Sequence, residues 1–151
     1  MRLFMSQQID KKRHCVFRLT FHAVLVVKYR RKCITQEIGQ YLIDRSRVVI
    51  EANGGELIEG NSDIDHIHLL FSLQPDVNLS HFMASLKNTT SRMVRKTYGE
   101  YLSNYLYKDS FWSDSFYLST TGGASIDVAQ KYIENQGKPK RKYVKRAKSS
   151  I

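Results

Sequence analysis

The stretch DIDHIHLLFSL, residues 63–73, decides how this chain is expected to fold, because polar and apolar residues alternate in it. Ile67, Leu69 and Phe71 recur at every second position, and a period of two is typical of a β-strand with one buried face. We therefore predict a strand over residues 66–73. His66 and His68 share the opposite parity, so their imidazoles should project together from the other face of the strand.

Three further segments predict strands that complete an antiparallel sheet. ELIEG (56–60) precedes a short turn, so it should pair with residues 66–73 as a hairpin. CVFRLTFHAVLVVKY (15–29) alternates over its length, and FWSDSFYLSTTGG (111–123) closes on two glycines. EYLSNYLYKDS (100–110) is rich in tyrosine and is ambiguous, with a short helix as one interpretation.

Three segments have the three- and four-residue apolar spacing of helices that pack on a sheet. The expected helices cover residues 36–53, 78–99 and 126–136. Thr35 and Ser125 precede the first and the third, where a side-chain oxygen can cap the helix. The order strand, helix, strand, strand, helix, strand, helix predicts an α+β fold with an antiparallel sheet of about four strands.

Composition indicates one folded domain with a polyanionic partner. The 151 residues are 42% hydrophobic, and 24 Lys and Arg against 14 Asp and Glu give a net charge of +10. A protein this basic usually binds nucleic acid, although basic charge alone also fits a protein without that partner. We find no run of about 18 apolar residues and no secretory signal, so we expect a cytoplasmic protein. Residues 1–14 should be disordered, residues 15–137 should form the domain, and residues 138–151 should be a basic tail.

His66 and His68 are candidate metal ligands. Two neutral imidazoles on one face of a strand can share a divalent ion. The same spacing also arises by chance, so a pair without a metal stays an alternative. Ile67 and Leu69 point to the other face, and the two imidazoles are therefore not simply part of the core.

Tyr132 and Gln136 are candidates for the reactive group and a third ligand. They are four residues apart on the last helix, which places them on one helical face. A tyrosine is a usable nucleophile once its phenol loses its proton. The carbonyl oxygen of Gln136 is a hard ligand that favours Mg²⁺ or Mn²⁺ over zinc. Simple packing of Tyr132 against the sheet is the alternative.

Five motifs in one order carry a resemblance to a known family. They are LTFHAVLVVKYRRK, DHIHLLFSL, SLKNTTSRMVRK, FWSDSFYLSTTGG and VAQKYIENQ. In this order they resemble the single-tyrosine HUH transposases, the TnpA-type enzymes of the IS-two-hundred group of small bacterial insertion sequences. The histidine–hydrophobe–histidine motif is His66, Ile67 and His68. The resemblance covers about residues 15–137 and leaves the basic tail unassigned.

The resemblance implies a fold and a reaction. The expected fold is the dimeric HUH-endonuclease fold, a ferredoxin-like (RRM-like) sheet with helices packed on it. His66, His68 and Gln136 would hold Mg²⁺ or Mn²⁺, and Tyr132 would attack a phosphate of single-stranded DNA. The product would be a 5′-phosphotyrosine link and a free 3′-hydroxyl, which can be rejoined without ATP. The protein would act in a bacterial or archaeal cytoplasm, at the nucleoid.

The resemblance also implies partners. Two cuts need two active sites, so a homodimer would share its sites, with the tyrosine helix of one copy completing the histidine pair of the other. Gly122 and Gly123 would be hinges for this helix or would only form a turn. The DNA would carry hairpins at the ends of the element. Phosphate contacts are expected from seven basic residues: Arg30, Arg31, Lys32, Lys87, Arg92, Arg95 and Lys96. Trp112, Phe116 and Tyr117 would stack on bases or pack in the core.

Three other functions stay open from the sequence. One is a domesticated HUH nuclease that processes repeated extragenic hairpins with the same active site. A second is a replication initiator or relaxase of the HUH class, although those chains are usually larger. The third is a non-catalytic nucleic-acid-binding module with a ferredoxin-like sheet, which would explain the charge but not the histidine pair.

Overall fold

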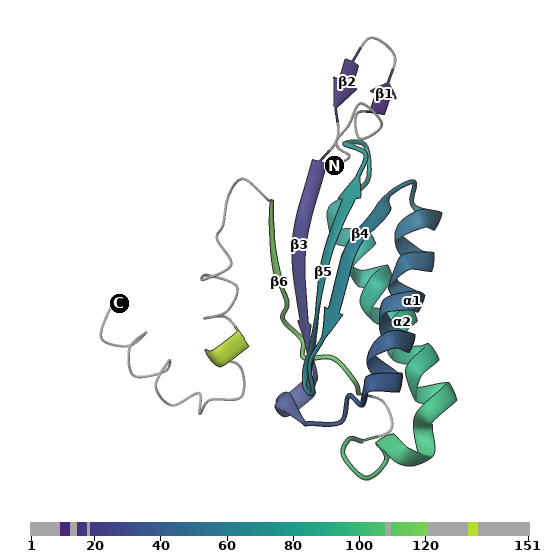
Figure 1. The fold of residues 1–151 in the computed structure, drawn as a ribbon, viewed down its shortest axis with the longest axis vertical. Coiled ribbons are helices and arrows are strands. Elements are labelled where there is room, and N and C mark those ends of the chain that lie inside the picture. The colour runs from purple at the N-terminus through teal and green to yellow at the C-terminus, as the bar shows by residue number, and fades with distance from the viewer. Residues whose placement is uncertain (1–9, 13–14, 18, 108–109, 121–132, 136–151) are drawn as a thin grey trace, which may run out of the picture.

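The computed structural model describes residues 10–12, 15–17, 19–107, 110–120 and 133–135. Its centre is a four-stranded antiparallel sheet with the strand order β4-β5-β3-β6 (Figure 1). A separate two-stranded ribbon pairs β1 with β2. The strands are β1 Asp10–Lys12, β2 Cys15–Phe17, β3 Leu19–Val26, β4 Glu56–Ser62, β5 His66–Leu73 and β6 Tyr117–Thr120. The predicted four-stranded sheet and the predicted hairpin of β4 and β5 are both confirmed.

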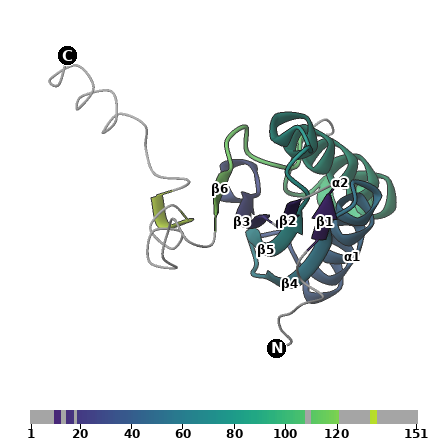
Figure 2. The ribbon, with the colours of Figure 1, turned by 90° about the horizontal axis from the view of Figure 1, so that it is seen from above.

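Two long helices cover one face of this sheet. They are α1, Gln36–Ala52, and α2, Leu79–Leu102, which lie side by side on the same side of the strands (Figures 1 and 2). The Thr35 hydroxyl accepts a hydrogen bond from the Ile38 backbone amide at 3.1 Å, which confirms the predicted N-cap of α1. Asn78 caps α2 in the same way, through the His81 amide at 3.0 Å.

The alternation along β5 separates the two faces of the sheet. Ile67, Leu69 and Phe71 are fully buried against the helices, as the sequence predicted. They meet the odd-numbered residues of β3, which are Phe21, Ala23 and Leu25. The opposite face, which we call the histidine face, carries His22, Val24 and Val26 of β3 and His66 and His68 of β5.

Three element boundaries differ from the prediction. The strand predicted over 15–29 is two strands in separate sheets, β2 and β3; β3 ends at Val26 and is followed by a 3₁₀ turn, η2, at Lys28–Arg30. Helix α2 continues past Gly99 to Leu102, with a local kink at Tyr98 (φ −119°, ψ 24°), because Gly99 does not take the left-handed conformation that ends a helix. The strand predicted over 111–123 is only Tyr117–Thr120.

Trp112 explains why the last strand starts late. Its indole is buried and donates a hydrogen bond to the Thr90 hydroxyl of α2 at 2.9 Å. This contact draws the chain toward the helix layer, so Trp112 forms only an isolated bridge with Val27. Core packing, rather than base stacking, is therefore the role of Trp112.

Two predictions about the chain ends reach residues outside the described part. Within the third expected helix, 126–136, only residues 133–135 are described, and they are helical. Gly122, Gly123, Tyr132, Gln136 and the tail 138–151 lie outside the described residues. In the part of the chain that the structure covers, no helix is both long and apolar enough to cross a membrane.

Replacing Thr90 by valine should destabilise the fold. Thr90→Val keeps the shape of the side chain but leaves the buried Trp112 indole N–H without its acceptor. An unsatisfied buried donor costs about 1–3 kcal/mol, so the free energy of unfolding in urea should fall by that amount. The matched change Thr89→Val, at a half-buried neighbour on the same helix, should have little effect. Equal losses in the two variants would contradict this account.

Candidate active site

Backbone pairing fixes the position of the two predicted metal ligands. β5 lies between β3 and β4, and its register places His66 opposite Val26 and His68 opposite Val24. Side chains directly opposite in an antiparallel pair share one face of the sheet. Both histidines are half-buried, and they lie on a central strand of the sheet rather than on a loop.

His66 is held by a buried carboxylate. Its Nδ1 lies 2.8 Å from Oδ1 of Asp65, and the other oxygen of Asp65 accepts from Nε of Arg30 at 2.7 Å. Burial alone would raise the pKa of Asp65, but the hydrogen bonds from His66 and Arg30 outweigh it and lower that pKa. An ionised carboxylate only accepts, so Nδ1 of His66 donates this hydrogen bond, which in a neutral imidazole leaves the lone pair on Nε2.

Arg30 reaches this carboxylate from a strained turn. Tyr29 and Arg30 are the non-glycine residues with positive φ in the described chain, at 57° and 55°. The left-handed conformation costs such residues roughly 1–2 kcal/mol each. The turn aims the Arg30 guanidinium at Asp65, and its Nη1 also donates to the Glu134 carbonyl at 3.4 Å. Arg30 therefore joins the partner of His66 to the described part of the last helix.

His68 has a histidine partner that the sequence analysis missed. Nδ1 of His22 lies 3.1 Å from Nε2 of His68, a hydrogen bond in which one ring must be the neutral acceptor. Burial, followed by the charges of His22 and His66, lowers the pKa of His68. His68 is thereby kept in the neutral form that can donate a lone pair. Alternation along β3 places His22 on the face opposite to Phe21 and Ala23, and this can be read from the sequence. That His68 is its partner follows only from the register between β3 and β5.

The described part of the last helix lies on the histidine face. Ile133 is buried and packs against Val24 and Val26, with Tyr117 of β6 beside it. These valines are the direct cross-strand neighbours of His68 and His66. Figures 1 and 2 show this short segment beside β6, on the side of the sheet away from α1 and α2. The chain therefore brings the residue after Tyr132 to the strand next to the histidine pair.

The comparisons with known proteins identify the family of this chain. The family model described as "Transposase IS200 like" matches residues 15–136. The chain belongs to this family. It is 31% identical to the ISDra2 transposase TnpA of Deinococcus radiodurans over 85% of this chain and 91% of the relative. It is 28% identical to the transposase of insertion sequence IS200 of Salmonella typhimurium, over 82% of this chain and 80% of the relative.

Solved structures show the same fold. A candidate transposase from Deinococcus radiodurans R1 superposes with a TM-score of 0.77 at 26% identity, covering 86% of this chain and 99% of that one. A REP-associated tyrosine transposase bound to a REP hairpin superposes with a TM-score of 0.51 at 15% identity, over 81% of this chain and 67% of that one. The predicted family and fold class are confirmed, and the chain is a transposase, an enzyme of DNA transposition.

The histidine pair of this transposase fits a divalent ion as part of a ligand set. His66 offers Nε2, because Asp65 holds its Nδ1. His68 is neutral, but its Nε2 contacts His22, so ligation through that atom would displace His22. Among the described residues, no group of three or more His, Cys, Asp or Glu is placed to hold a metal. A complete site therefore needs a donor of another type or from another segment; Gln136 lies outside the described residues, and its role stays a prediction.

The predicted DNA-binding residues of the transposase fall into two groups. Lys87 donates hydrogen bonds to the carbonyls of Ser113 and Asp114 at 2.8 Å each, and Arg30 donates one to the Asp65 carboxylate. Both side chains therefore hold parts of the fold together. The pKa of Lys87 is lowered, mainly by burial. The charge of Asp114 opposes this shift, and the charge of Lys28 adds to it. The remaining residues lie at the surface.

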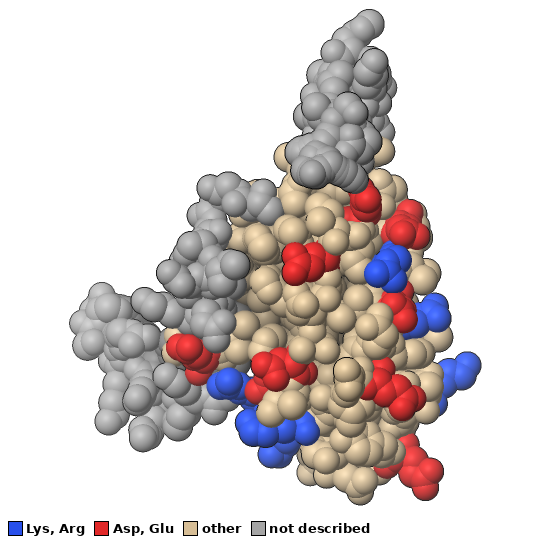
Figure 3. Space-filling view, in the orientation of Figure 1, with Lys and Arg blue, Asp and Glu red and all other residues tan. Residues whose placement is uncertain are grey.

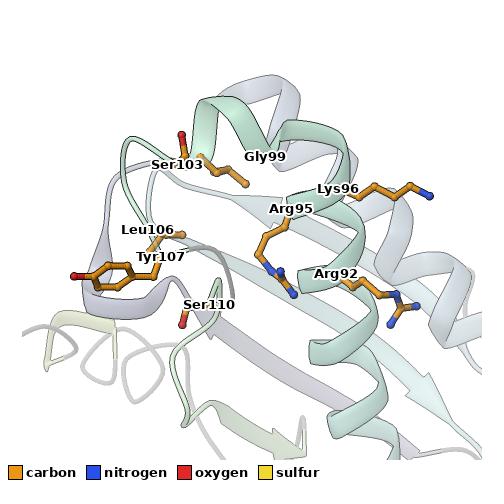
Figure 4. A pocket seen from close by; sticks show the side chains of 9 residues that line it. Arg92, Arg95, Lys96, Gly99, Ser103, Leu106, Tyr107 and Ser110 are labelled. Atoms are coloured by element: carbon orange, nitrogen blue, oxygen red, sulfur yellow. The ribbon is translucent and has the colours of Figure 1, made fainter.

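Three of the surface residues share one cavity. Arg92, Arg95 and Lys96 line a cavity of about 350 Å³ at the end of α2 (Figure 4). Arg95 extends from the helix toward Ser110, whereas Lys96 points away from the cavity centre. Arg31 and Lys32 are exposed beside η2.

Removing the guanidinium of Arg30 should destabilise the site. Arg30→Met leaves the carboxylate of Asp65 buried without one of its partners. We expect the unfolding free energy to fall by about 1–3 kcal/mol. This is less than the cost of breaking a fully buried ion pair, because the Arg30 side chain is 32% exposed. The adjacent, exposed Arg31→Met should change it by less than about 0.5 kcal/mol. In a double-mutant cycle, Asp65→Asn should cost less in Arg30→Met than in the wild type; strict additivity would contradict the contact.

Proposed function

We propose that this transposase cleaves and rejoins single-stranded DNA at the hairpin-bearing ends of its element, with Tyr132 as the nucleophile. The proposal rests on one observation: Ile133 packs against Val24 and Val26, the cross-strand neighbours of the histidine pair. Tyr132 precedes Ile133 in the chain, and the sequence predicts that both lie on one helix. A purely structural helix would not require a buried carboxylate that orients His66.

His66, His68 and Gln136 would hold the ion, Mg²⁺ or Mn²⁺. Bound there, the ion would supply Lewis-acid stabilisation of the charge that develops on a phosphate oxygen. Asp65 holds His66 in the tautomer with a free Nε2, and Arg30 keeps Asp65 ionised. Burial and the neighbouring histidines keep His68 neutral. The chain thus orients His66 for ligation, whereas ligation through Nε2 of His68 would require His22 to move away.

Tyr132 would make and break the bonds to phosphorus. Its phenol oxygen attacks the scissile phosphate, loses its proton and forms a 5′-phosphotyrosine bond. The bond to the 3′-oxygen of the preceding nucleotide breaks, and that oxygen takes up a proton. In the second step a 3′-hydroxyl attacks the phosphotyrosine, which restores a phosphodiester and releases the phenol. Because each step exchanges one phosphate ester for another, no ATP is needed.

The proposed enzyme works as a homodimer with shared active sites, since excision needs two cuts at once. The described contacts of Ile133 and Glu134 are within one chain, so an exchange between copies must break these contacts. Gly122 and Gly123 would act as the hinges for this movement. Arg31, Lys32, Arg92, Arg95 and Lys96 would contact DNA phosphates, whereas Arg30 and Lys87 would act through the fold.

The covalent intermediate tests the nucleophile. With Mn²⁺ and a single-stranded hairpin taken from the DNA flanking the gene, the wild type should form an adduct that survives a denaturing gel. Tyr132→Phe should lose the adduct by roughly a thousandfold or more and keep hairpin binding. Tyr117→Phe, which keeps the half-buried ring on the same face, should retain the adduct. An adduct that persists in Tyr132→Phe would show that another tyrosine attacks.

Metal removal tests the histidine pair. His66→Ala should abolish cleavage while the circular dichroism spectrum stays that of the folded protein. Because the change removes a partner of the buried Asp65, the unfolding free energy should fall by about 1–3 kcal/mol, as in Arg30→Met. EDTA should abolish wild-type cleavage, and added Mg²⁺ or Mn²⁺ should restore it. Cleavage that continues at the same rate in EDTA would refute the metal role and leave the tyrosine result standing.

A further inference from the structure

Two adjoining cavities lie where η2 meets the turn that follows α2. One, of about 340 Å³, is lined by Lys28, Tyr29 and Arg31 on one side and by Tyr105 and Tyr107 on the other. We call it the tyrosine cleft. The other is the cavity of Arg92, Arg95 and Lys96 in Figure 4. Four residues line both cavities, namely Ser103, Leu106, Tyr107 and Ser110, so the two adjoin, and we call them together the depression.

The rings of the tyrosine cleft face solvent instead of the core. Tyr107 is 86% exposed and Tyr29 is 66% exposed, and Tyr105 is exposed as well. Large aromatic side chains normally lose most of their surface on folding. Exposed rings collected around one cavity are the arrangement with which proteins stack unpaired bases.

Tyr29 is held outward at an energetic cost. Its φ of 57° is left-handed, and its ring lies between two cations, with Lys28 Nζ at 5.9 Å and Arg31 Cζ at 5.6 Å from the centroid. Strained residues of this kind gather at ligand clamps and active sites. The same turn sends Arg30 inward to Asp65, so one strained segment presents a ring to solvent and a guanidinium to the site.

The charge around the depression favours an anion. Its described lining contains Lys28, Arg31, Arg92, Arg95 and Lys96 and no Asp or Glu. Lys28 also lies 3.7 Å from Asp114, which neutralises part of this charge. Figure 3 shows basic side chains gathered at the end of the sheet where η2 lies, bordered by acidic ones on the sheet side. A phosphate chain that passes through the depression would therefore meet cations on both sides of Tyr107.

We propose that the tyrosine cleft binds an unpaired nucleotide of single-stranded DNA, with the base stacked on Tyr107 and Tyr29. The phosphates on either side would lie near Arg31 and Arg92. A volume of about 340 Å³ is at the small end for ligand sites, which suits one nucleotide and excludes a duplex. The proposal rests on the proposed function and specifies where the enzyme holds its single strand.

The cleft is joined to the candidate active site through one residue. Arg30 stands between Tyr29 and Arg31 in the chain, and its guanidinium holds the carboxylate that orients His66. A strand fixed at Tyr29 is therefore fixed at the turn that also positions the metal ligand. The cleft would set which phosphate of the strand reaches the histidine face.

Binding of an unstructured strand tests the cleft without any chemistry. The probe is a fluorescent oligothymidylate of about ten nucleotides, a usual length for single-strand sites, measured by anisotropy with full-length Tyr132→Phe protein in EDTA. Tyr107→Ala should raise Kd roughly 5- to 150-fold, the loss of one stacked base. Tyr107→Phe, which keeps the ring, should bind as the parent does. Val48→Ala, at an exposed apolar residue of α1 outside both linings, is the control.

A salt titration tests the cations. Arg92→Gln should reduce the slope of log Kd against log salt concentration by about 0.7, the value for one phosphate of a single strand. Arg47 is an exposed residue of α1 that pairs with Asp44, and Arg47→Gln should leave the slope unchanged. Photocrosslinking of a 5-iodouracil-containing probe should label Tyr29 or Tyr107. Crosslinks confined to other tyrosines would overturn the proposal.

The outcome separates this proposal from the proposed function. Unchanged affinity in both Tyr107→Ala and Tyr29→Ala would overturn the cleft, while the covalent adduct at Tyr132 could still form. Loss of affinity in these variants, together with the absence of an adduct in protein that keeps Tyr132, would support the cleft and refute the proposed chemistry. Tyr107 is almost fully exposed, so its replacement does not depend on a change in the fold.

Discussion

The antiparallel register between β3 and β5 is the constraint on which the rest of the structure depends. It buries Ile67, Leu69 and Phe71 against α1 and α2, and it sets His66 and His68 beside two valines on the opposite face. A slip of one residue would send the histidines into the core and the apolar side chains into solvent. The packing energy of the core therefore maintains the geometry of the candidate active site.

The strained turn at Tyr29 and Arg30 connects the separate parts of the molecule. Its backbone ends β3, sends Arg30 to the buried Asp65 and turns Tyr29 outward between Lys28 and Arg31. Arg30 also contacts the backbone of Glu134 in the last helix. His66, residues 133–135 and the tyrosine cleft are thereby all connected to one short segment. This is a physical reason for the strain to persist in the folded protein.

The sequence predicts the parts of this structure that depend on local patterns. Alternation predicts the faces of β5, and the polar residue at Thr35 predicts the start of α1 because capping is decided within one turn. Contacts between distant segments were not predictable in this way. His22 meets His68 only through the register, Asp65 has its role because Arg30 is folded back on it, and Trp112 leaves the sheet for Thr90. Gly99 was expected to end α2, but a glycine ends a helix only where the backbone turns left-handed.

The central claim is that the histidine face is the reaction face of this transposase. The most direct measurement is anomalous diffraction from crystals grown with Mn²⁺, because it locates the ion without reference to activity. The account predicts one strong manganese peak shared by His66 and His68, with the Nε2 atom of His66 as a ligand and Asp65 on its Nδ1. Crystals with manganese bound elsewhere and none at this pair, at concentrations that support cleavage, would contradict it.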